Sequence, residues 1–338
     1  MPKKVLTFTA VAAAVAIVIA GTALTNPTPP RITFPGGKQF AFSIVDDTDL
    51  ATLERLQPIY AVLSKYGIRS TKTVWTLDSN NTSHDANNGD TLTNPDYRAF
   101  IKSLKNHGFE IALHGVRGGG SPRADIVRGL GEFRQELGSD PTMQVNHSLN
   151  EDNLYWGSKR YSLGLYRLSF GRLMTGVSSG EDPLSPYFWG DLAKERIRYV
   201  RQFTFSEVNL LRVNPSMPYR RAETPYVNFW FQTSNGANVD AFDELLAHER
   251  LDQLEQEGGV CLVYSHLGAG SFNKPGGLDR RFEERIKDVA SRNGWFAPAS
   301  EILDYLAKRP GWTGQPGFLE RFRMETQFTV GRAMNGGS

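Results

Sequence analysis

The sequence predicts an α/β fold, a barrel of seven or eight parallel strands with helices between them. Short apolar segments of strand character alternate with amphipathic helical segments through most of the chain. Alternate residues of the first strand divide by size, as expected where one face of a strand lines a narrow interior. No glycine-rich phosphate loop follows that strand, which argues against an open nucleotide-binding sheet.

The elements follow one another in a regular order. The predicted strands are residues 39–46, 70–75, 109–114, 143–147, 200–205, 226–231, 260–266 and 294–297. The predicted helices are residues 50–66, 95–107, 123–137, 241–257 and 280–293. Two long segments, residues 77–95 and 157–195, are expected to form loops or additional helices over one end of the barrel.

The first and third strands carry the clearest pattern of the barrel. In the first strand the small residues Ala41, Ser43, Val45 and Asp47 share one face, and Phe40, Phe42 and Ile44 share the other. In the third strand Glu110, Ala112 and His114 alternate with Phe109, Ile111 and Leu113. Small residues therefore point into the interior and large residues toward helices, with a polar group at the carboxyl end of the inner face.

Charge and cysteine content exclude several classes of protein. The formal net charge is +2, from 38 basic and 36 acidic residues spread along the chain, so nothing indicates a nucleic-acid partner or a polybasic membrane surface. The single cysteine, Cys261, lies in an apolar run and is expected to be buried and inert.

The first thirty residues differ from the rest of the chain. Lys3 and Lys4 precede an uncharged segment, residues 5–24, which is followed by the proline-rich residues 26–30. This arrangement predicts an export signal, either a cleaved signal peptide or a retained membrane anchor, with a linker. Residues 31–338 then form the barrel domain, which is exported to the cell envelope, membrane-anchored or periplasmic or extracellular.

Polar side chains occur where predicted strands end. They are Asp46 and Asp47, His114, Asn146 and His147, and His266. In a barrel the carboxyl ends of parallel strands meet on one face, where active sites form. Two histidines and a carboxylate that meet there would bind a divalent cation and leave positions for water and substrate. Singly, each residue also has a structural interpretation: the aspartates as a turn or helix cap with Thr48 and Asp49, the histidines as core residues.

These segments resemble the polysaccharide deacetylase, or NodB-like, family. The resemblance covers residues 40–306 in order and rests on residues 40–47, Glu-Ile-Ala-Leu-His at 110–114, Tyr-Ser-His-Leu-Gly at 264–268, and the closing segment 295–303. It implies a deacetylase-like barrel, with Asp46 as catalytic base, Asp47 and His114 as metal ligands, and His266 as general acid.

The chain departs from the family at the second metal motif. The family has a further histidine four residues after the first, and Gly118 stands there. His147 ends the neighbouring strand, so we expect it to complete the metal site, with Asp49, Asn146 or water as alternatives. The family's arginine-proline loop is not recognisable at the fourth strand.

A complete site of this kind predicts a metal-dependent hydrolase. The metal, most consistent with zinc, would polarise an amide or ester carbonyl and lower the pKa of a water molecule toward ~7. The expected substrate is an acylated (acetylated) polysaccharide or sugar of the cell envelope. The alternatives are a catalytically silent glycan-binding or scaffolding protein on the same barrel, and a glycosidase in which Asp46 pairs with a second acid.

Overall fold

Seven parallel strands form a closed barrel in the computed structural model, which describes residues 26–171, 176, 178–274 and 276–335. Each strand pairs with the next in chain order, and β7 pairs back onto β1 along Ala41 to Asp46. The strands are β1 Phe40–Asp46, β2 Thr71–Val74, β3 Glu110–Leu113, β4 Met143–Gln144, β5 Tyr199–Phe205, β6 Phe229–Asn235 and β7 Val260–Ser265. The predicted parallel barrel is therefore confirmed.

An eighth parallel strand, β10 (Gly294–Phe296), shares one edge of β1 with β2. It pairs with Phe40 to Phe42, whereas β2 pairs with Val45 and Asp46. This explains why the sequence indicated seven or eight strands. Seven strands close the barrel, and β10 pairs with the N-terminal part of β1, which β2 does not reach. A small antiparallel pair, β8 (Asn273–Lys274) and β9 (Gly277–Leu278), lies apart from the barrel sheet.

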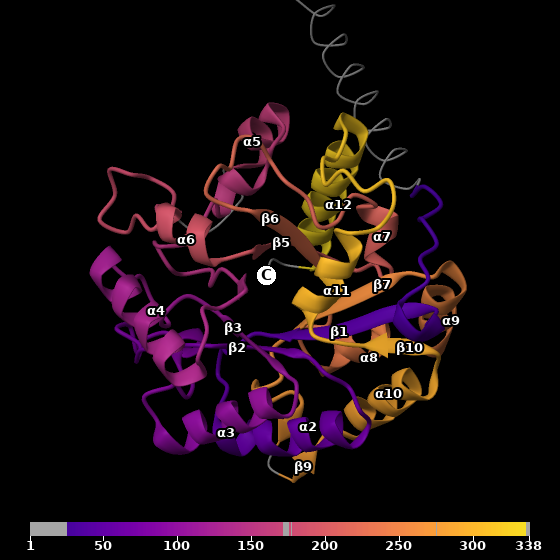
Figure 1. Cartoon of the computed structure of the whole chain (residues 1–338), viewed down its shortest axis with the longest axis horizontal. Helices are drawn as coiled ribbons and strands as arrows, with labels where there is room; N and C mark the ends of the chain where they lie inside the picture. The colour runs from indigo at the N-terminus through magenta and orange to yellow at the C-terminus, as the bar shows by residue number, and fades with distance from the viewer. Residues whose placement is uncertain (1–25, 172–175, 177, 275, 336–338) are drawn as a thin grey trace, which may run out of the picture.

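Helices surround the strands on all sides (Figure 1). The α-helices are α2 Leu53–Lys65, α3 Pro95–Asn106, α4 Arg123–Leu137, α5 Gly164–Phe170, α6 Gly190–Arg196, α7 Leu210–Val213, α8 Val239–Leu245, α9 His248–Glu257, α10 Arg280–Ser291, α11 Ala299–Leu306 and α12 Phe318–Asn335. The short 3₁₀ turns in the described part of the chain are η1 Pro35–Gly37, η2 Asp85–Asn87 and η3 Gly157–Arg160. Local signals explain several ends: the Thr52 hydroxyl caps α2, Asn94 caps α3 before Pro95, and Gly138 ends α4 with φ 78°.

The predicted elements correspond to observed ones, with several differences. The strand predicted at residues 226–231 is β6, Phe229–Asn235. The predicted helix 241–257 is two helices, α8 and α9. The fourth strand is shorter than predicted, ending at Gln144 rather than at residue 147. The C-terminal helix α12 was not predicted; it packs against β5, where Phe328 contacts Phe203 with ring centroids 4.5 Å apart.

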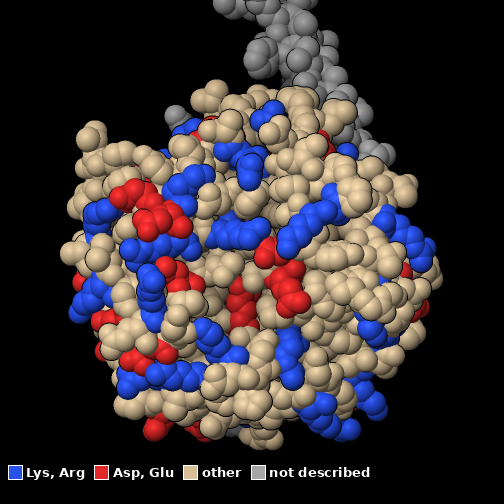
Figure 2. Space-filling model, in the orientation of Figure 1, with Lys and Arg blue, Asp and Glu red and all other residues tan. Residues whose placement is uncertain are grey.

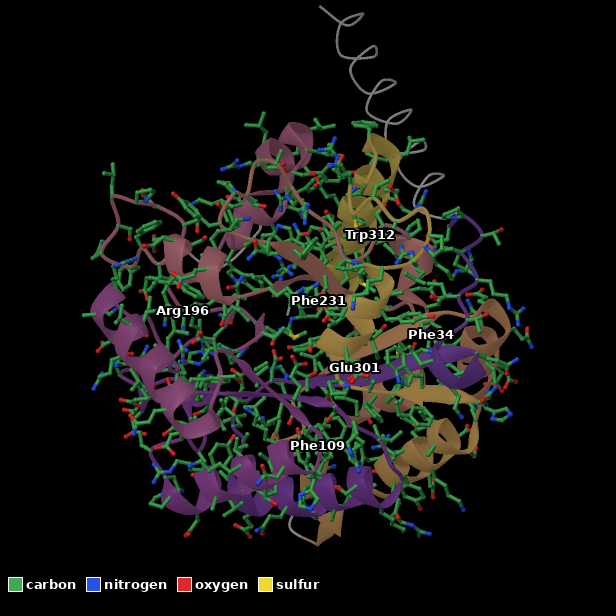
Figure 3. All side chains as sticks on the ribbon, in the orientation of Figure 1. Phe34, Phe109, Arg196, Phe231, Glu301 and Trp312 are labelled. Atoms are coloured by element: carbon green, nitrogen blue, oxygen red, sulfur yellow. The ribbon has the colours of Figure 1, made fainter. Side chains whose placement is uncertain are left out.

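The two faces of β1 have the roles that residue size indicated. Phe40 and Phe42 contact Phe296 of β10, and Asp46, on the same face by alternation, contacts Tyr60 of the outer helix α2. Asp47, on the other face, reaches Arg201 on β5, a strand that does not adjoin β1, so this contact crosses the barrel end. Figure 3 shows Phe231 of β6 near the middle of the molecule and Phe109 beside α2 and α3.

The predicted export segment falls largely outside the described residues, which begin at Asn26. Among the residues that the structure does describe, no helix is both long and apolar enough to cross a bilayer. Cys261 is buried in β7 as expected. Basic and acidic side chains are interspersed over the face drawn in Figure 2, as the nearly balanced composition implies.

Candidate active site at the carboxyl end of the barrel

The loop between β1 and α2 brings two aspartates to the barrel end. The backbone N–H of Asp47 donates to the Ser265 carbonyl of β7 at 2.8 Å, which continues the strand pairing by one residue. Leu50 then takes the left-handed conformation, with φ 57°, and its N–H donates to the Asn88 carbonyl at 2.6 Å. Such a backbone is strained for a branched residue and persists only where the surroundings fix it. This turn directs Asp49 inward.

The carboxylate of Asp49 lies at the centre of three imidazoles. Its Oδ1 is 2.9 Å from Nε2 of His147, and its Oδ2 is 3.1 Å from Nε2 of His114 and 3.2 Å from Nε2 of His266. His114 and His147 are buried, and the His266 side chain is 25% exposed. The structure thus brings together His114, His147 and His266, as the strand-end pattern predicted, around an aspartate that the sequence offered only as an alternative ligand.

The two buried imidazoles are held by their surroundings. The Trp75 ring stacks on His114 with centroids 6.1 Å apart and meets His147 edge-on at 5.7 Å. Nδ1 of His147 lies 2.9 Å from Oδ1 of Asn150, an acceptor, so Nδ1 carries a proton, and a metal ion would displace the proton that Nε2 shares with Asp49. A hydrogen bond of this kind sets the tautomer that a metal-binding histidine needs.

Asp47 is held by an arginine from the opposite side of the barrel. Both terminal nitrogens of Arg201 donate to its carboxylate, at 2.8 and 2.6 Å, and the guanidinium lies 4.4 Å from the ring centre of Tyr264. A bidentate pair of this type fixes the orientation of the carboxylate. Oδ2 of Asp47 is 4.0 Å from Nε2 of His114, so this aspartate borders the imidazole cluster.

Asp46, which the sequence resemblance predicted as the catalytic base, is not among the residues that line the cavity. It is fully buried, and its carboxylate lies 3.2 Å from Nζ of Lys72 and accepts hydrogen bonds from the Tyr60 hydroxyl and the Leu267 N–H, both at 2.9 Å. Burial lowers the pKa of Lys72, but the Asp46 carboxylate outweighs burial and leaves it raised, so the lysine is charged. Asp46 faces the helices because adjacent strand residues point to opposite sides.

Gly118 shows why a histidine is absent from the usual second position. A Cβ atom at Gly118 would lie 2.8 Å from Cα and 2.9 Å from the carbonyl oxygen of Asn87, which belongs to η2 in the long 77–95 segment. No side chain fits there without moving that backbone. His147 instead stands beside His114, with ring centroids 5.3 Å apart.

Asn146, the other alternative ligand, has a structural task. Its amide group donates to the Leu154 carbonyl at 3.0 Å and accepts from the Leu154 N–H at 3.2 Å. Both ends of the side chain therefore close the loop after β4, although the residue borders the cavity.

The cluster attracts positive charge. Burial raises the pKa of Asp49, but the charge of His114 and the hydrogen bonds from the three imidazoles outweigh burial and hold that pKa well below its usual value of 3.8. Burial lowers the pKa of His147 and of His266, but Asp49 outweighs burial in both and leaves each pKa raised. Protons and a metal cation compete for the same lone pairs at such a site.

A cavity of about 280 Å³ opens over this cluster. Its lining includes Asp47, Asp49, His114, His147, Trp156, Arg160, Arg201, Tyr264 and His266. The donor set fits a divalent metal: ligand atoms of Asp49, His114 and His147 lie within 4.8 Å of one another, as do those of Asp47, Asp49 and His266. Mixed imidazole and carboxylate donors with one side open to a cavity suit zinc and other transition ions.

Sequence reasoning missed two arginines of this cavity. Arg201 lies inside an apolar strand, and Arg160 follows an aromatic segment of the long insertion 157–195. A charged residue in the middle of an apolar strand is rarely buried without a charged partner, and this signal could have identified Arg201 as the partner of a buried carboxylate. No comparable signal in the sequence distinguishes Arg160 from an exposed arginine.

Comparisons with known proteins bear on the fold. No protein-family model and no curated protein matches the chain. The crystal structure of Puue allantoinase matches 84% of this chain and 96% of its own, at 13% identity and a TM-score of 0.50. A probable polysaccharide deacetylase from Pseudomonas aeruginosa PAO1 matches the same shares, at 13% identity and a TM-score of 0.51. At this identity the likeness concerns the fold, and it confirms the NodB-like barrel that the sequence resemblance implied.

Proposed function

We propose that this protein is a metal-dependent hydrolase that removes acyl groups, acetyl above all, from an exported polysaccharide or a related substrate with a carbon–nitrogen bond. The observation that carries the proposal is the convergence of three imidazole Nε2 atoms on the Asp49 carboxylate, at 2.9 to 3.2 Å, on the wall of an open cavity. The fold shared with a probable polysaccharide deacetylase and an allantoinase is consistent with hydrolysis of carbon–nitrogen bonds.

The aspartates have other roles in this proposal than the sequence predicted: Asp49 is the metal ligand in place of Asp47, and Asp47 is the base in place of Asp46. Asp49, His114 and His147 would hold the metal, since their ligand atoms form one group. Asp49 replaces Asp47 as the carboxylate ligand because it contacts both imidazoles directly, whereas Asp47 is 4.0 Å from His114 and engaged by Arg201. When bound, the metal polarises the acyl carbonyl and lowers the pKa of a water molecule.

Asp47 and His266 supply proton transfer in this proposal. Asp47 accepts the proton of the attacking water, and the two hydrogen bonds from Arg201 hold its carboxylate in place while it does so. His266 donates a proton to the departing amine; its partly exposed ring lies against Asp49 and Tyr264, and its raised pKa favours the protonated form. Asp47 thus takes the role that the resemblance assigned to Asp46.

The glycosidase alternative has little support from this cavity. Asp46 lies outside it, and of the two carboxylates among its lining residues Asp49 is engaged by the imidazoles, which leaves Asp47 alone. A glycosidase needs one carboxyl group free to donate a proton and another free to act as base or nucleophile.

Metal content tests the proposal. The full chain purified without chelator should contain about one zinc ion and release acetate from an acetylated amino-sugar polymer. Asp49→Ala and His147→Ala should each lose both properties. His248→Ala and Asp240→Ala are matched controls, because these side chains are 64% and 81% exposed and remote from the cavity.

Arg201→Gln separates the two carboxylate roles. It should keep zinc, because Asp49 and the imidazoles remain, but reduce acetate release by about a hundredfold, because Asp47 loses its orientation. A folded protein that binds no metal and releases no acetate would instead support the silent glycan-binding alternative.

A further inference from the structure

Arg160 is a buried guanidinium at the edge of the candidate active site. The residue is 3% exposed and ends the 3₁₀ turn η3, and it lines the same cavity as Asp49 and the three imidazoles. Its guanidinium carbon lies 4.0 Å from the ring centre of Trp156 and 4.3 Å from that of Phe328. Two aromatic rings therefore fix the plane of the guanidinium at the cavity wall.

Its charge has no acidic partner. All aspartates and glutamates of the chain fall within the described residues, and none of them forms an ion pair with Arg160. The neighbouring arginines differ: Arg201 pairs with Asp47, and Arg221 pairs with Glu223 at 3.0 Å. Burial, followed by repulsion from Arg332 and Arg201, lowers the pKa of Arg160 well below its usual value. An arginine nevertheless stays protonated in proteins, so a buried positive charge is left uncompensated.

Its hydrogen-bonding capacity is also incompletely used. One terminal nitrogen donates to the Gln202 carbonyl, but Nε is buried and, within the described part of the chain, has no partner. The guanidinium is not needed to hold its own turn, because the Arg160 carbonyl already accepts hydrogen bonds from Gln202 at 2.7 Å and Arg221 at 2.8 Å. A buried guanidinium that lines an open cavity, with an unpaired donor and no acidic partner, indicates a group that binds a ligand.

We propose that the substrate carries an acidic group, a carboxylate or other oxyanion, that binds Arg160 while its acyl group lies at Asp49 and the imidazoles. This inference rests on the proposed function and narrows its substrate class to acylated sugars that bear an acid. An oxyanion there would neutralise the buried charge and accept hydrogen bonds from the guanidinium, whose plane Trp156 and Phe328 hold in place.

Matched substrates test the acidic group. N-acetylmuramic acid is N-acetylglucosamine with a lactyl ether on O3 that ends in a carboxylate, and N-acetylglucosamine 6-phosphate carries a phosphate instead. The zinc-loaded full chain should have a kcat/KM at least about tenfold higher for one of the acidic sugars than for the neutral one, since a charge-assisted pair supplies a difference of that order. Which acid is preferred tells a carboxylate from a phosphate.

Substitution of Arg160 tests whether this residue causes the preference for acidic sugars. Arg160→Gln should abolish the preference and leave kcat/KM for the neutral sugar within about threefold, whereas Arg160→Lys should keep part of it. Arg220→Gln removes an exposed arginine that is likewise stacked, 4.4 Å from the Phe229 ring centre, and should change nothing. A purely structural role for Arg160 would lower kcat/KM for acidic and neutral sugars equally, and that result overturns the proposal.

A binding measurement separates this proposal from the proposed function. Calorimetric titration of the three sugars into the wild-type chain and Arg160→Gln needs no catalysis. Equal affinities for acidic and neutral sugars would overturn the acidic-group proposal even if acetate is released. An acid preference that Arg160→Gln removes supports it, and in a protein that holds no zinc the same result would leave the acid site standing while the hydrolase fails.

Discussion

The buried pair of Asp46 and Lys72 allows a sharp test of which aspartate does what. Both side chains are inaccessible to solvent, with Oδ2 and Nζ 3.2 Å apart. In the described part of the chain Asp46 is the only carboxylate that forms an ion pair with Lys72. We therefore predict that Asp46→Asn lowers stability strongly while leaving zinc content unchanged, because Asp46 is a structural residue outside the cavity.

The size of the effect follows from the geometry. Removing one partner of a buried ion pair costs about 3 to 5 kcal/mol, because the other charge stays buried without compensation. The single oxygen of asparagine can still accept from the Leu267 N–H, and its NH2 group can donate to the Tyr60 hydroxyl oxygen, so we expect the lower end, about 3 kcal/mol. For a domain of this size that corresponds to a fall of roughly 6 °C in Tm.

Thermal unfolding of three variants, with zinc content measured on each, checks this reasoning. Asp46→Asn alone should unfold at the lower temperature. The double variant Asp46→Asn with Lys72→Met should recover most of the loss, because both charges have gone. Asp47→Asn should abolish acetate release. If Asp46→Asn left Tm unchanged and abolished acetate release, the role of base would return to Asp46 and the reasoning would be refuted.

Three further predictions concern the surroundings of the site. Asn150→Ala should weaken zinc binding about 10- to 100-fold in chelator competition, because Nδ1 of His147 loses its acceptor; an unchanged affinity would deny that contact its orienting role. Burial raises the pKa of Asp152 to about 7, so the folded state holds a proton that the unfolded state releases near pH 4. The stability that this proton contributes is fully present below pH 4 and is lost as the pH rises toward 7. Asp152→Asn should therefore be more stable than wild type by up to about 4 kcal/mol at pH 8 and equally stable at pH 4. A stability difference that does not change with pH in denaturant titrations would contradict this. Gly118→His should lower Tm without strengthening zinc binding, because its Cβ would meet the Asn87 backbone; tighter zinc binding would show that the loop yields.

The barrel could be predicted because its signals are local. Each strand is a short apolar run, and the division of β1 into small and large faces depends only on alternation. Helix α12 escaped prediction because its buried residues Phe328, which contacts β5, and Met324, which contacts Gln232 of β6, lie among many polar residues, and their partners are far away in sequence. The division between α8 and α9 was missed because the segment has a single amphipathic pattern.

The site was only partly predictable, and Asp46 shows why. The alternation that indicated a barrel also puts Asp46 on the face of Phe40 and Phe42, toward the helices, and only Asp47 on the inner face. The family resemblance assigned roles by order along the chain and so overrode that pattern. Asp49 could not be placed from the sequence, because the direction of its side chain depends on the left-handed backbone at Leu50. Leucine rarely adopts this conformation, so the sequence gives no signal for it.

The departure at Gly118 and the position of His147 have one structural cause. The long segment that contains η2 packs against Gly118, where Ser79 also donates to the Gly118 carbonyl at 2.6 Å, and this packing leaves no room for a side chain. A metal-binding side chain at position 118, in the loop after β3, is thereby excluded, whereas His147 after the end of β4 is not. Oδ1 of Asn150 contacts both the Gly119 N–H and Nδ1 of the His147 ring. The same asparagine thus ties the altered loop to the imidazole beside His114, so shortening the 77–95 segment should disturb zinc binding through His147 even though none of its residues is a ligand.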